Sequence, residues 1–136
     1  MKKLIAANWK MNKTVKESIS FIKQFKKRIS NKKNVDIVIC PAFTALQAVS
    51  KALKGGDIKL GAQNMHFEDS GAYTGEVSPT MLKDIGCSYV ILGHSERREI
   101  GENDSLINKK VIAALKHGLK PILCIGENLE QRKNNK

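Results

Sequence analysis

The sequence predicts an α/β protein with a parallel sheet, and three observations support this. Five short apolar runs recur about every thirty residues, several of them with little alternation of polar and apolar residues, and helical patterns lie between them. Strands covered on both faces lack such alternation, and strands that alternate with helices are typical of a parallel sheet. The 136 residues, 41% of them hydrophobic, can form one core. We therefore expect a single domain over residues 1–136.

The apolar runs define five expected strands. They cover residues 3–8, 35–40, 58–63, 88–93 and 121–126. Parallel strands of this kind place their carboxyl ends at one edge of the sheet. The residues that follow each run are therefore the first place to look for a functional site.

Four helices are expected between these strands. The first has one apolar face at spacings of three and four residues, formed by Val15, Ile19, Ile22, Phe25 and Ile29. The second covers about residues 44–53, before two glycines that are a usual C-terminal signal. The third covers residues 79–86, with Ser78 as its expected N-cap and Pro79 at its first position. The fourth covers 104–118, with Asp104 as its expected N-cap.

One connection is much longer than the others. Residues 64–77 form a loop that contains Phe67 and Tyr73. Loops of this length inside compact domains tend to be functional. We expect the aromatic side chains of this loop to contact a partner subunit.

Two architectures fit this order of elements. One is an open, doubly wound sheet of the flavodoxin-like kind, and the other is the first portion of a (β/α)8 barrel. Periodicity does not separate them. In both, ligands bind at the carboxyl ends of the strands.

The net charge of +11 is concentrated near the start of the chain. The first 34 residues hold eleven Lys or Arg residues against one acid, Glu17. Such a bias can indicate nucleic acid or an anionic membrane as a partner. The aromatic content of 5% provides little for base stacking, and the charges recur at helical spacing. We therefore expect a solvated helix face, with no nucleic acid and no membrane as partner.

Three scattered cysteines, Cys40, Cys87 and Cys124, form no pair with metal-ligand spacing. They are expected to be buried thiols in a reducing compartment, and no metal site is expected. The start of the chain has no signal-peptide pattern, and no apolar run approaches the roughly 18 residues of a membrane span. We expect a cytoplasmic protein.

Polar residues follow the first and fourth strands. Asn8 and Lys10 lie two residues apart, which favours a shared direction and a grip for an anion or a carbonyl group. His94 follows Gly93, and the next residues suit a helical start, where the helix dipole disfavours imidazolium. A neutral His94 can donate a hydrogen bond to a substrate oxygen. Glu96 is placed to pair with Lys10, whereas a capping or structural role is the simpler alternative for each of these residues.

Arg97 and Arg98, which complete the charged run, are expected to form structural ion pairs rather than to bind a ligand.

Four stretches of the sequence together resemble the triosephosphate isomerase family in order and spacing. They are "AANWKMNKT", "GAQNMHFEDSGAYTGEVSPTML", "VILGHSERREIGE" and "PILCIGE". The resemblance covers residues 1 to about 132 and implies a (β/α)8 TIM barrel. The family interconverts dihydroxyacetone phosphate and glyceraldehyde 3-phosphate through an enediolate, in glycolysis and gluconeogenesis, without metal or cofactor. A small phosphorylated triose is the substrate that this resemblance implies.

The resemblance also implies roles for single residues. Asn8 and Lys10 resemble the substrate-binding pair, with Lys10 stabilising negative charge. His94 resembles the electrophile that polarises the carbonyl group, and a donor preorganised in this way contributes on the order of 3 kcal/mol. This enzyme family is itself the familiar example of a catalytic histidine kept neutral at a helix N-terminus. Glu96 resembles a supporting carboxylate near the lysine.

Two further regions are assigned by the resemblance. Cys124 and Glu127, at the end of the fifth strand, match supporting residues of the family's "CIGE" stretch. Residues 65–78 are similar to the interlocking loop of a homodimer, in which Thr74, next to Tyr73, reaches towards the neighbouring active site.

The sequence departs from the family in its length. Family members have roughly 250 residues, the usual size of an eight-stranded barrel. The glutamate that acts as general base follows the sixth strand in the family, and no matching stretch is present in this chain. We therefore expect five parallel strands and four to five helices, a barrel that is not closed with open edges at 3–8 and 121–126, and no activity of the chain alone. The alternative is a non-catalytic half-barrel that binds a phosphorylated ligand or pairs with another subunit.

Overall fold

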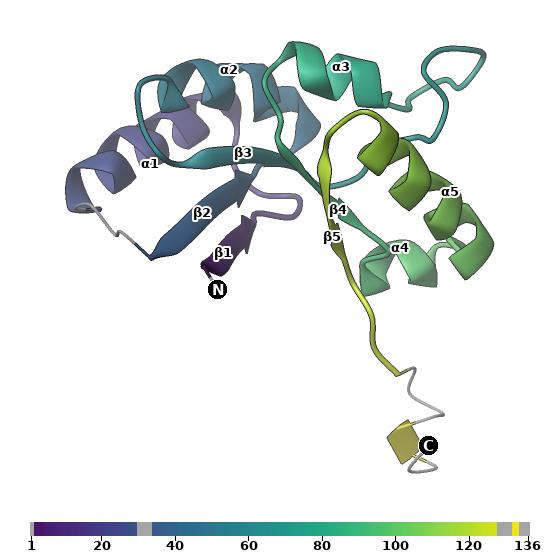
Figure 1. The fold of residues 1–136 in the computed structure, drawn as a ribbon. Coiled ribbons are helices and arrows are strands. Elements are labelled where there is room, and N and C mark those ends of the chain that lie inside the picture. The colour runs from purple at the N-terminus through teal and green to yellow at the C-terminus, as the bar shows by residue number, and fades with distance from the viewer. Residues whose placement is uncertain (1, 30–33, 128–131, 134–136) are drawn as a thin grey trace.

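The fold is a curved parallel sheet with helices on one side (Figure 1), seen in a computed structural model that describes residues 2–29, 34–127 and 132–133. The elements follow one another as β1 (Lys3–Asn8), α1 (Val15–Arg28), β2 (Val35–Cys40), α2 (Phe43–Leu53), β3 (Lys59–Ala62), α3 (Pro79–Asp84), β4 (Tyr89–Leu92), α4 (Ser95–Glu99), α5 (Asp104–Lys116) and β5 (Lys120–Leu123). This order confirms the predicted α/β alternation.

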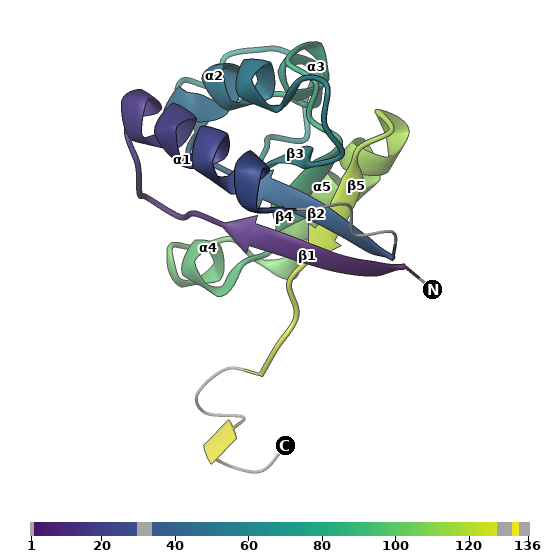
Figure 2. The same cartoon turned by 90° about the vertical axis from the view of Figure 1, so that its left-hand side faces the viewer.

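The strand order separates the two predicted architectures. The strands lie in the order β1-β2-β3-β4-β5, and each pair is parallel. A doubly wound sheet reverses its strand order and carries helices on both faces. Here the order follows the sequence, and the helices cover the outer, convex side of the sheet (Figure 2). The fold is therefore an open part of a (β/α)8 barrel, with β1 and β5 as edges, as predicted.

Local capping explains where the helices begin. Thr14 and Glu17 form a capping box at the start of α1, in which each side chain bonds to the other residue's backbone N–H. Ser78 caps α3 and accepts from the backbone of Met81. The predicted N-cap of the last helix was wrong by one residue: Asn103, not Asp104, accepts from the backbone N–H of Leu106. Asp104 lies in the first turn and pairs with an arginine instead.

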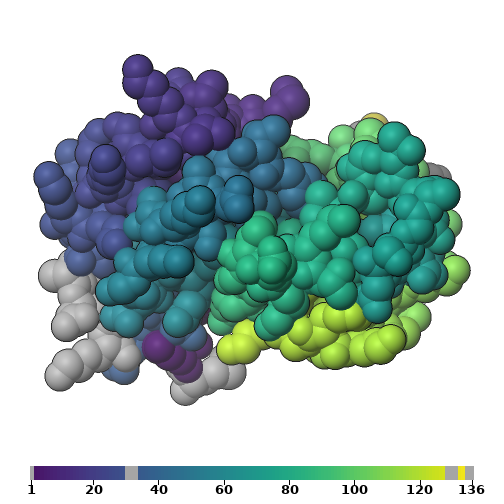
Figure 3. Space-filling model, turned by 90° about the horizontal axis from the view of Figure 1, so that it is seen from above, coloured from purple at the N-terminus to yellow at the C-terminus, as the bar shows by residue number. Residues whose placement is uncertain are grey.

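Apolar side chains fill both sides of the sheet unequally. The larger core lies between the sheet and the helices and includes Ile22, Ile39, Leu46, Val49, Leu60, Met65, Leu82, Val90 and Leu92. The smaller cluster includes Val38, Cys40, Tyr89 and Ile91, which alternate along their strands with residues of the larger core. Figure 3 shows the helix-covered face, where α1, α2 and the loop before α3 form a continuous surface. The fold thus buries one face thoroughly and leaves the other thinly covered.

Three strands are shorter than predicted. The expected strands 58–63 and 88–93 are β3 and β4, each of which lacks one residue at either end. The expected strand 121–126 is β5, which begins one residue earlier and ends at Leu123. It pairs with β4 only, since it forms an edge of the sheet. Leu123 and Ile125 are exposed, and so are Leu4 and Ile5 on the other edge strand. Exposed apolar residues at both edges fit the predicted open barrel.

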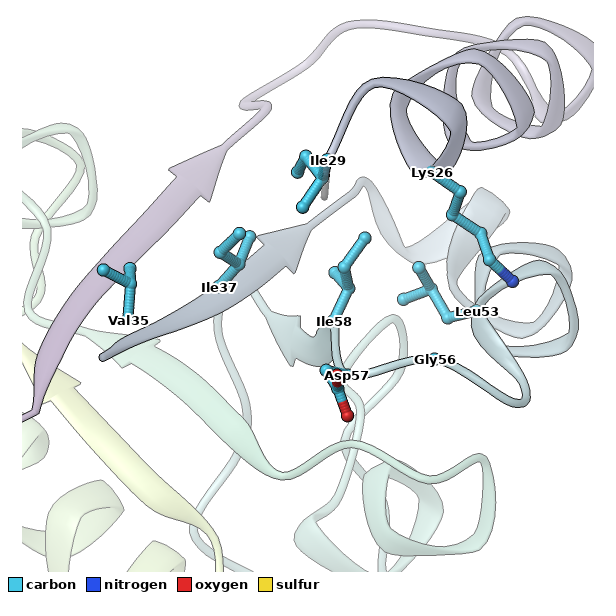
Figure 4. Close-up of a pocket in the computed structure, with 8 residues that line it drawn as sticks. All are labelled: Lys26, Ile29, Val35, Ile37, Leu53, Gly56, Asp57 and Ile58. Carbon is cyan, nitrogen blue, oxygen red and sulfur yellow. The ribbon is translucent and has the colours of Figure 1, made fainter. Parts of the chain in front are cut away.

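A pocket of about 190 Å³ lies between the ends of α1 and α2 and the beginning of β2 (Figure 4). It is lined by Lys26, Ile29, Val35, Ile37, Leu53, Gly56, Asp57 and Ile58. The ammonium group of Lys26 has a structural role in this pocket. Its Nζ donates to the carbonyl oxygens of Ala52 and Lys54 at 3.1 and 3.2 Å and so caps the end of α2. The pocket is at the amino-terminal rim of the sheet, away from the strand ends that carry the predicted site.

Within the described residues, no helix combines the length and apolar character that crossing a membrane requires.

Candidate active site

The predicted site residues gather at the carboxyl ends of β1 and β4. Figure 2 shows the end of β1 and helix α4, which follows β4, at the same end of the sheet. Lys10 follows β1, while His94 and Glu96 lie at the start of α4. The structure therefore brings three residues from two distant segments to one rim, where ligands bind in barrels of this kind.

The backbone after β1 has a conformation that residues other than glycine rarely adopt. Lys10 has a φ of 53°, in the left-handed region that disfavours residues with a Cβ. Asn8 stabilises this turn, because its Oδ1 accepts a hydrogen bond from the backbone N–H of Lys10 at 2.9 Å. The prediction had both side chains pointing the same way as neighbours on a strand. Instead, Lys10 lies beyond the strand, and Asn8 contacts its backbone. Strain of this kind clusters at functional sites.

Gln63 is a further residue at this turn, and the sequence pattern did not indicate it. Its Nε2 donates to the carbonyl oxygens of Lys10 and Cys40, each at 2.9 Å. It thereby joins the segment after β3 to the end of β2 and to the strained turn after β1. Nothing in the periodicity marks a single glutamine after a strand. The signal was only its place in the stretch "GAQN" at a strand end.

His94 is aimed by the turn after β4. Gly93 has a φ of 69°, and this left-handed conformation lets the chain turn from β4 into α4. His94 is the N-cap of α4, and its Nδ1 accepts a hydrogen bond from the backbone N–H of Glu96 at 3.3 Å. A nitrogen that accepts carries no hydrogen, so the ring proton of neutral His94 is assigned to Nε2. Nε2 of His94 has no hydrogen-bond partner among the described residues, so this nitrogen can donate to a ligand.

Glu96 contacts both of the other predicted groups. Its Oε1 lies 2.6 Å from Nζ of Lys10, and its Oε2 lies 3.4 Å from Nδ1 of His94. The predicted pairing of Lys10 with Glu96 is confirmed. The hydrogen bond from Lys10, together with the charge of Lys10, holds the pKa of Glu96 below its usual value. Glu96 thus remains ionised and fixes the position of the ammonium group.

The two arginines of the charged run form structural ion pairs, as predicted. Arg98 donates to the carbonyl oxygen of Gly93 at 2.8 Å and pairs with Asp104 at 2.5 Å. Its second terminal nitrogen lies 3.4 Å from the carbonyl oxygen of Cys124. Arg98 therefore joins the ends of β4 and β5 and the start of α5.

Behind this rim lies a buried polar cluster that the sequence did not predict. Nζ of Lys110 lies 2.6 Å from Glu102 and 3.0 Å from Oδ1 of Asn64, and Arg97 contacts the same Glu102 oxygen at 2.7 Å. Burial raises the pKa of Glu102, but the hydrogen bonds from Lys110 and Arg97 outweigh it and leave the pKa below its usual value. The second oxygen of Glu102 is buried and has no partner among the described residues. The cluster fastens the long loop to α5.

The cysteines are free, as expected, but differ in burial. Cys40 and Cys87 are buried, and burial raises the pKa of each to about 12. Cys124 is only half-buried; burial raises its pKa and the charge of Arg98 opposes this. Its backbone N–H donates to Leu92 at 2.9 Å, which keeps it beside the end of β4.

The remaining predicted residues lie apart from the rim cluster. Glu127 is exposed, four residues beyond the end of β5, and lines a groove beside α4. Tyr73 and Thr74 lie in the long loop, where Tyr73 stacks on His66 with ring centroids 4.1 Å apart. No contact joins Glu127, Tyr73 or Thr74 to Lys10 or His94 within the described part of the chain. The geometry thus assembles Asn8, Lys10, His94 and Glu96 only.

Comparison with known proteins gives consistent matches. A family model described as triosephosphate isomerase matches residues 3–136. The triosephosphate isomerase of Alkaliphilus oremlandii (strain OhILAs) is 57% identical over 135 residues, which are 98% of this chain and 54% of the relative. That of Aquifex aeolicus (strain VF5) is 56% identical over 133 residues, which are 97% of this chain and 54% of the relative. That of Clostridium botulinum (strain Loch Maree / Type A3) is 56% identical over 133 residues, which are 97% of this chain and 53% of the relative.

The chain spans about half the length of the curated relatives it matches. The family match nevertheless extends over nearly the whole chain, and the open part of a barrel and the rim cluster agree with it. The chain belongs to the triosephosphate isomerase family.

Proposed function

We propose that this chain supplies the electrophilic part of an active site that interconverts dihydroxyacetone phosphate and glyceraldehyde 3-phosphate. The observation that carries the proposal is the contact of one carboxylate, Glu96, with both Lys10 and His94 at the carboxyl rim. An ammonium group and a neutral imidazole beside each other suit a substrate whose carbonyl oxygen gains negative charge. When such a substrate becomes an enediolate, its two oxygens share this negative charge.

His94 polarises the carbonyl group of the substrate in this proposal. Its Nδ1 is occupied by the backbone N–H of Glu96, which leaves Nε2–H free to donate to a substrate oxygen. A neutral donor can also return a proton between the two oxygens of the intermediate. A donor fixed before the reaction stabilises developing charge without reorganisation and contributes on the order of 3 kcal/mol.

Lys10 and Asn8 bind the substrate in this proposal. The ammonium group of Lys10 is held by Glu96 at 2.6 Å and attracts the negative charge of the substrate. Asn8 acts mainly on the backbone of Lys10, through the 2.9 Å hydrogen bond to its Oδ1. The amide nitrogen of Asn8 is left to contact substrate, and Gln63 holds the same turn from the opposite side.

This polypeptide alone is expected to lack turnover. Proton abstraction needs a carboxylate about 3 Å from the substrate carbon. Among the carboxylates of the described residues, only that of Glu96 contacts Lys10 or His94, and its pairing with Lys10 commits it to another role. Glu127 lies outside this cluster and is exposed. We therefore propose that a base from outside this chain completes the site.

We also propose that the complete enzyme is a cytoplasmic homodimer. The long loop places Tyr73 and Thr74 on the surface, where they can reach a second copy. The loop has internal hydrogen bonds, such as that from the backbone of His66 to Val77 at 2.8 Å, which order it before association. Three free cysteines suit a reducing compartment.

Complementation tests the proposal. This chain is mixed with a separately produced carboxyl-terminal half of the Aquifex aeolicus relative, and isomerisation is measured with each half alone and with both. We expect turnover only in the mixture. His94→Gln in this chain should lower that turnover by about a hundredfold or more. No turnover from a soluble, associated pair would contradict the proposal.

The same experiment distinguishes the non-catalytic alternative. A half-barrel that only binds or pairs would associate with the second half but leave the reaction unaccelerated. His94→Gln would then change neither association nor rate. Turnover by this chain alone would show that one of its own carboxylates acts as the base.

A further inference from the structure

We propose that His117 and Asp69 form a protonation-dependent latch that fastens the long loop of residues 64–77 to the end of α5. His117 is the C-cap of α5, and Asp69 belongs to the loop. Figure 1 shows the loop beside the end of α5 that is near α3. The latch lies outside the rim cluster, so the proposal depends neither on isomerase activity nor on dimerisation.

Both ring nitrogens of His117 face hydrogen-bond acceptors. Nδ1 lies 2.8 Å from the carbonyl oxygen of Ala113, and Nε2 lies 2.8 Å from Oδ1 of Asp69. A carbonyl oxygen and an ionised carboxylate can only accept, so each nitrogen must carry a hydrogen for both bonds to exist. Only the imidazolium form has two N–H groups. Loss of one proton therefore leaves a lone pair facing an acceptor and breaks one of the two bonds.

Charged groups of both signs surround the His117 ring. The last carbonyl groups of α5 form the negative end of the helix dipole, and Asp69 adds a full negative charge. Lys116 is adjacent on the same helix. Lys83 of α3 lies close to Gly118, its Nζ being 3.9 Å from the position that a Cβ there would take, and Lys109 lies over the Phe67 ring of the loop at 5.3 Å. The side chain of His117 is 17% exposed, so solvent protons can reach it.

The latch fastens the loop at Asp69 to the end of α5. Thr80 also donates to the carbonyl oxygen of Asp69 at 3.3 Å, which places this residue between α3 and α5. Beyond it, the loop carries Tyr73 at its exposed part. Deprotonation of His117 therefore weakens the latch and lets the loop open more often. The latch is closed at lower pH and weakens as the pH rises, because the neutral ring no longer carries the charge that attracts Asp69 and keeps only one of its two hydrogen bonds.

His66 provides an internal control within the same loop. Its Nδ1 accepts from the backbone N–H of Glu68 at 3.0 Å, so the neutral ring already satisfies its contact. Its ring also stacks on Phe67 and Tyr73. The contacts of His66 therefore do not need a second ring hydrogen, whereas those of His117 do.

Nuclear magnetic resonance on the full 136-residue chain tests the latch. The ¹⁵N signals of the imidazole rings give the number of ring hydrogens between about pH 6 and pH 8.5, the range in which histidine titrates. Amide exchange, corrected for the intrinsic rate, gives protection in the loop, for example at Tyr73 and Glu76, relative to amides of the sheet. We expect two ring hydrogens on His117 at the lower pH and one at the higher pH. Loop protection should fall by roughly threefold to tenfold at the higher pH.

Variants separate the latch from general effects of pH. Asp69→Asn removes the charge while keeping the shape, and it should give low loop protection at both pH values. Asp84→Asn makes the same change at an exposed carboxylate of α3 that has no ion-pair partner within the described residues, and it should behave like the parent chain. A single ring hydrogen on His117 at the lower pH, or loop protection that neither pH nor Asp69→Asn changes, would overturn the proposal.

Discussion

Oε1 of Glu96 lies 2.6 Å from Nζ of Lys10, and this ion pair joins the ends of β1 and β4, two strands that are not neighbours in the sheet. Both side chains are about half exposed, so solvent screens the pair and it adds little to stability. Its consequence is positional: the ammonium is held at the rim beside His94. The pair therefore matters for binding and chemistry more than for folding.

Replacing Glu96 should separate these two effects. We expect Glu96→Gln to lower turnover of the complemented enzyme by roughly a hundredfold, because the ammonium group of Lys10 loses its fixed position. The midpoint of thermal unfolding should hardly change. Glu99→Gln, an exposed neighbour in α4, is the matched control and should affect neither quantity. A large loss of thermal stability in Glu96→Gln would show that the pair is structural.

Gln63 should support the strained turn at Lys10. Gln63→Ala leaves the carbonyl oxygen of Lys10 without the Gln63 donor and leaves that of Cys40 with the backbone N–H of Trp9 alone, and we expect the free energy of unfolding to fall by about 1 to 3 kcal/mol. Gln47→Ala, at an exposed position of α2, should change it by less than about 0.5 kcal/mol. Denaturant unfolding measures both values. Equal effects of the two substitutions would mean that Gln63 does not stabilise the turn.

The buried pair of Lys110 and Glu102 should be sensitive to the loss of one partner. Their side chains are 3% and 6% exposed. Lys110→Met removes a charge that compensates Glu102 and leaves Asn64 without its donor, so we expect a loss of about 3 kcal/mol or more. Lys116→Met, exposed on the same helix, should cost little. Denaturant unfolding again gives both values, and stability of Lys110→Met equal to that of the parent would show that Arg97 alone neutralises Glu102.

The open edges should cause the isolated chain to associate. Edge strands expose unpaired backbone groups that can pair with another chain. Ile5 on β1 and Ile112 on α5 are each 58% exposed, which makes them a matched pair. Ile5→Lys should shift sedimentation of the chain towards the monomer at high concentration, and Ile112→Lys should not. Addition of the carboxyl-terminal half should suppress the self-association of this chain, because that half would cover the open edges. If both substitutions reduced association equally, the association would come from nonspecific hydrophobic contact and not from the open edges.

The sequence predicted most of the fold because the signals were local. Apolar runs placed the strands, and Ser78 with Pro79 placed the start of α3, since capping depends on neighbouring residues. The choice between a barrel and a doubly wound sheet depends on strand order. Strand order is a long-range property, and in the sequence only the family resemblance pointed to it.

The site was predicted only in part, because some of its contacts are local in the sequence and others are long-range. His94, Lys10 and Glu96 stand at strand ends and fit known local patterns. Gln63 and Asn64 act across the fold: Gln63 donates to the carbonyl oxygens that follow β1 and end β2, and Asn64 accepts from Lys110 on α5. No periodicity announces such contacts, because they depend on how strands are placed side by side. They became visible only with the structure.

Direct evidence on the rim cluster would come from titrating the chain, alone and complemented with the carboxyl-terminal half, with a phosphorylated enediolate analogue while the side-chain signals of Lys10 and His94 are followed. We expect the analogue to shift both signals, to bind much more tightly to the complemented form, and to bind more weakly to His94→Gln. Tight binding to the complemented form that leaves the signals of Lys10 and His94 unchanged would show that these residues do not hold the substrate.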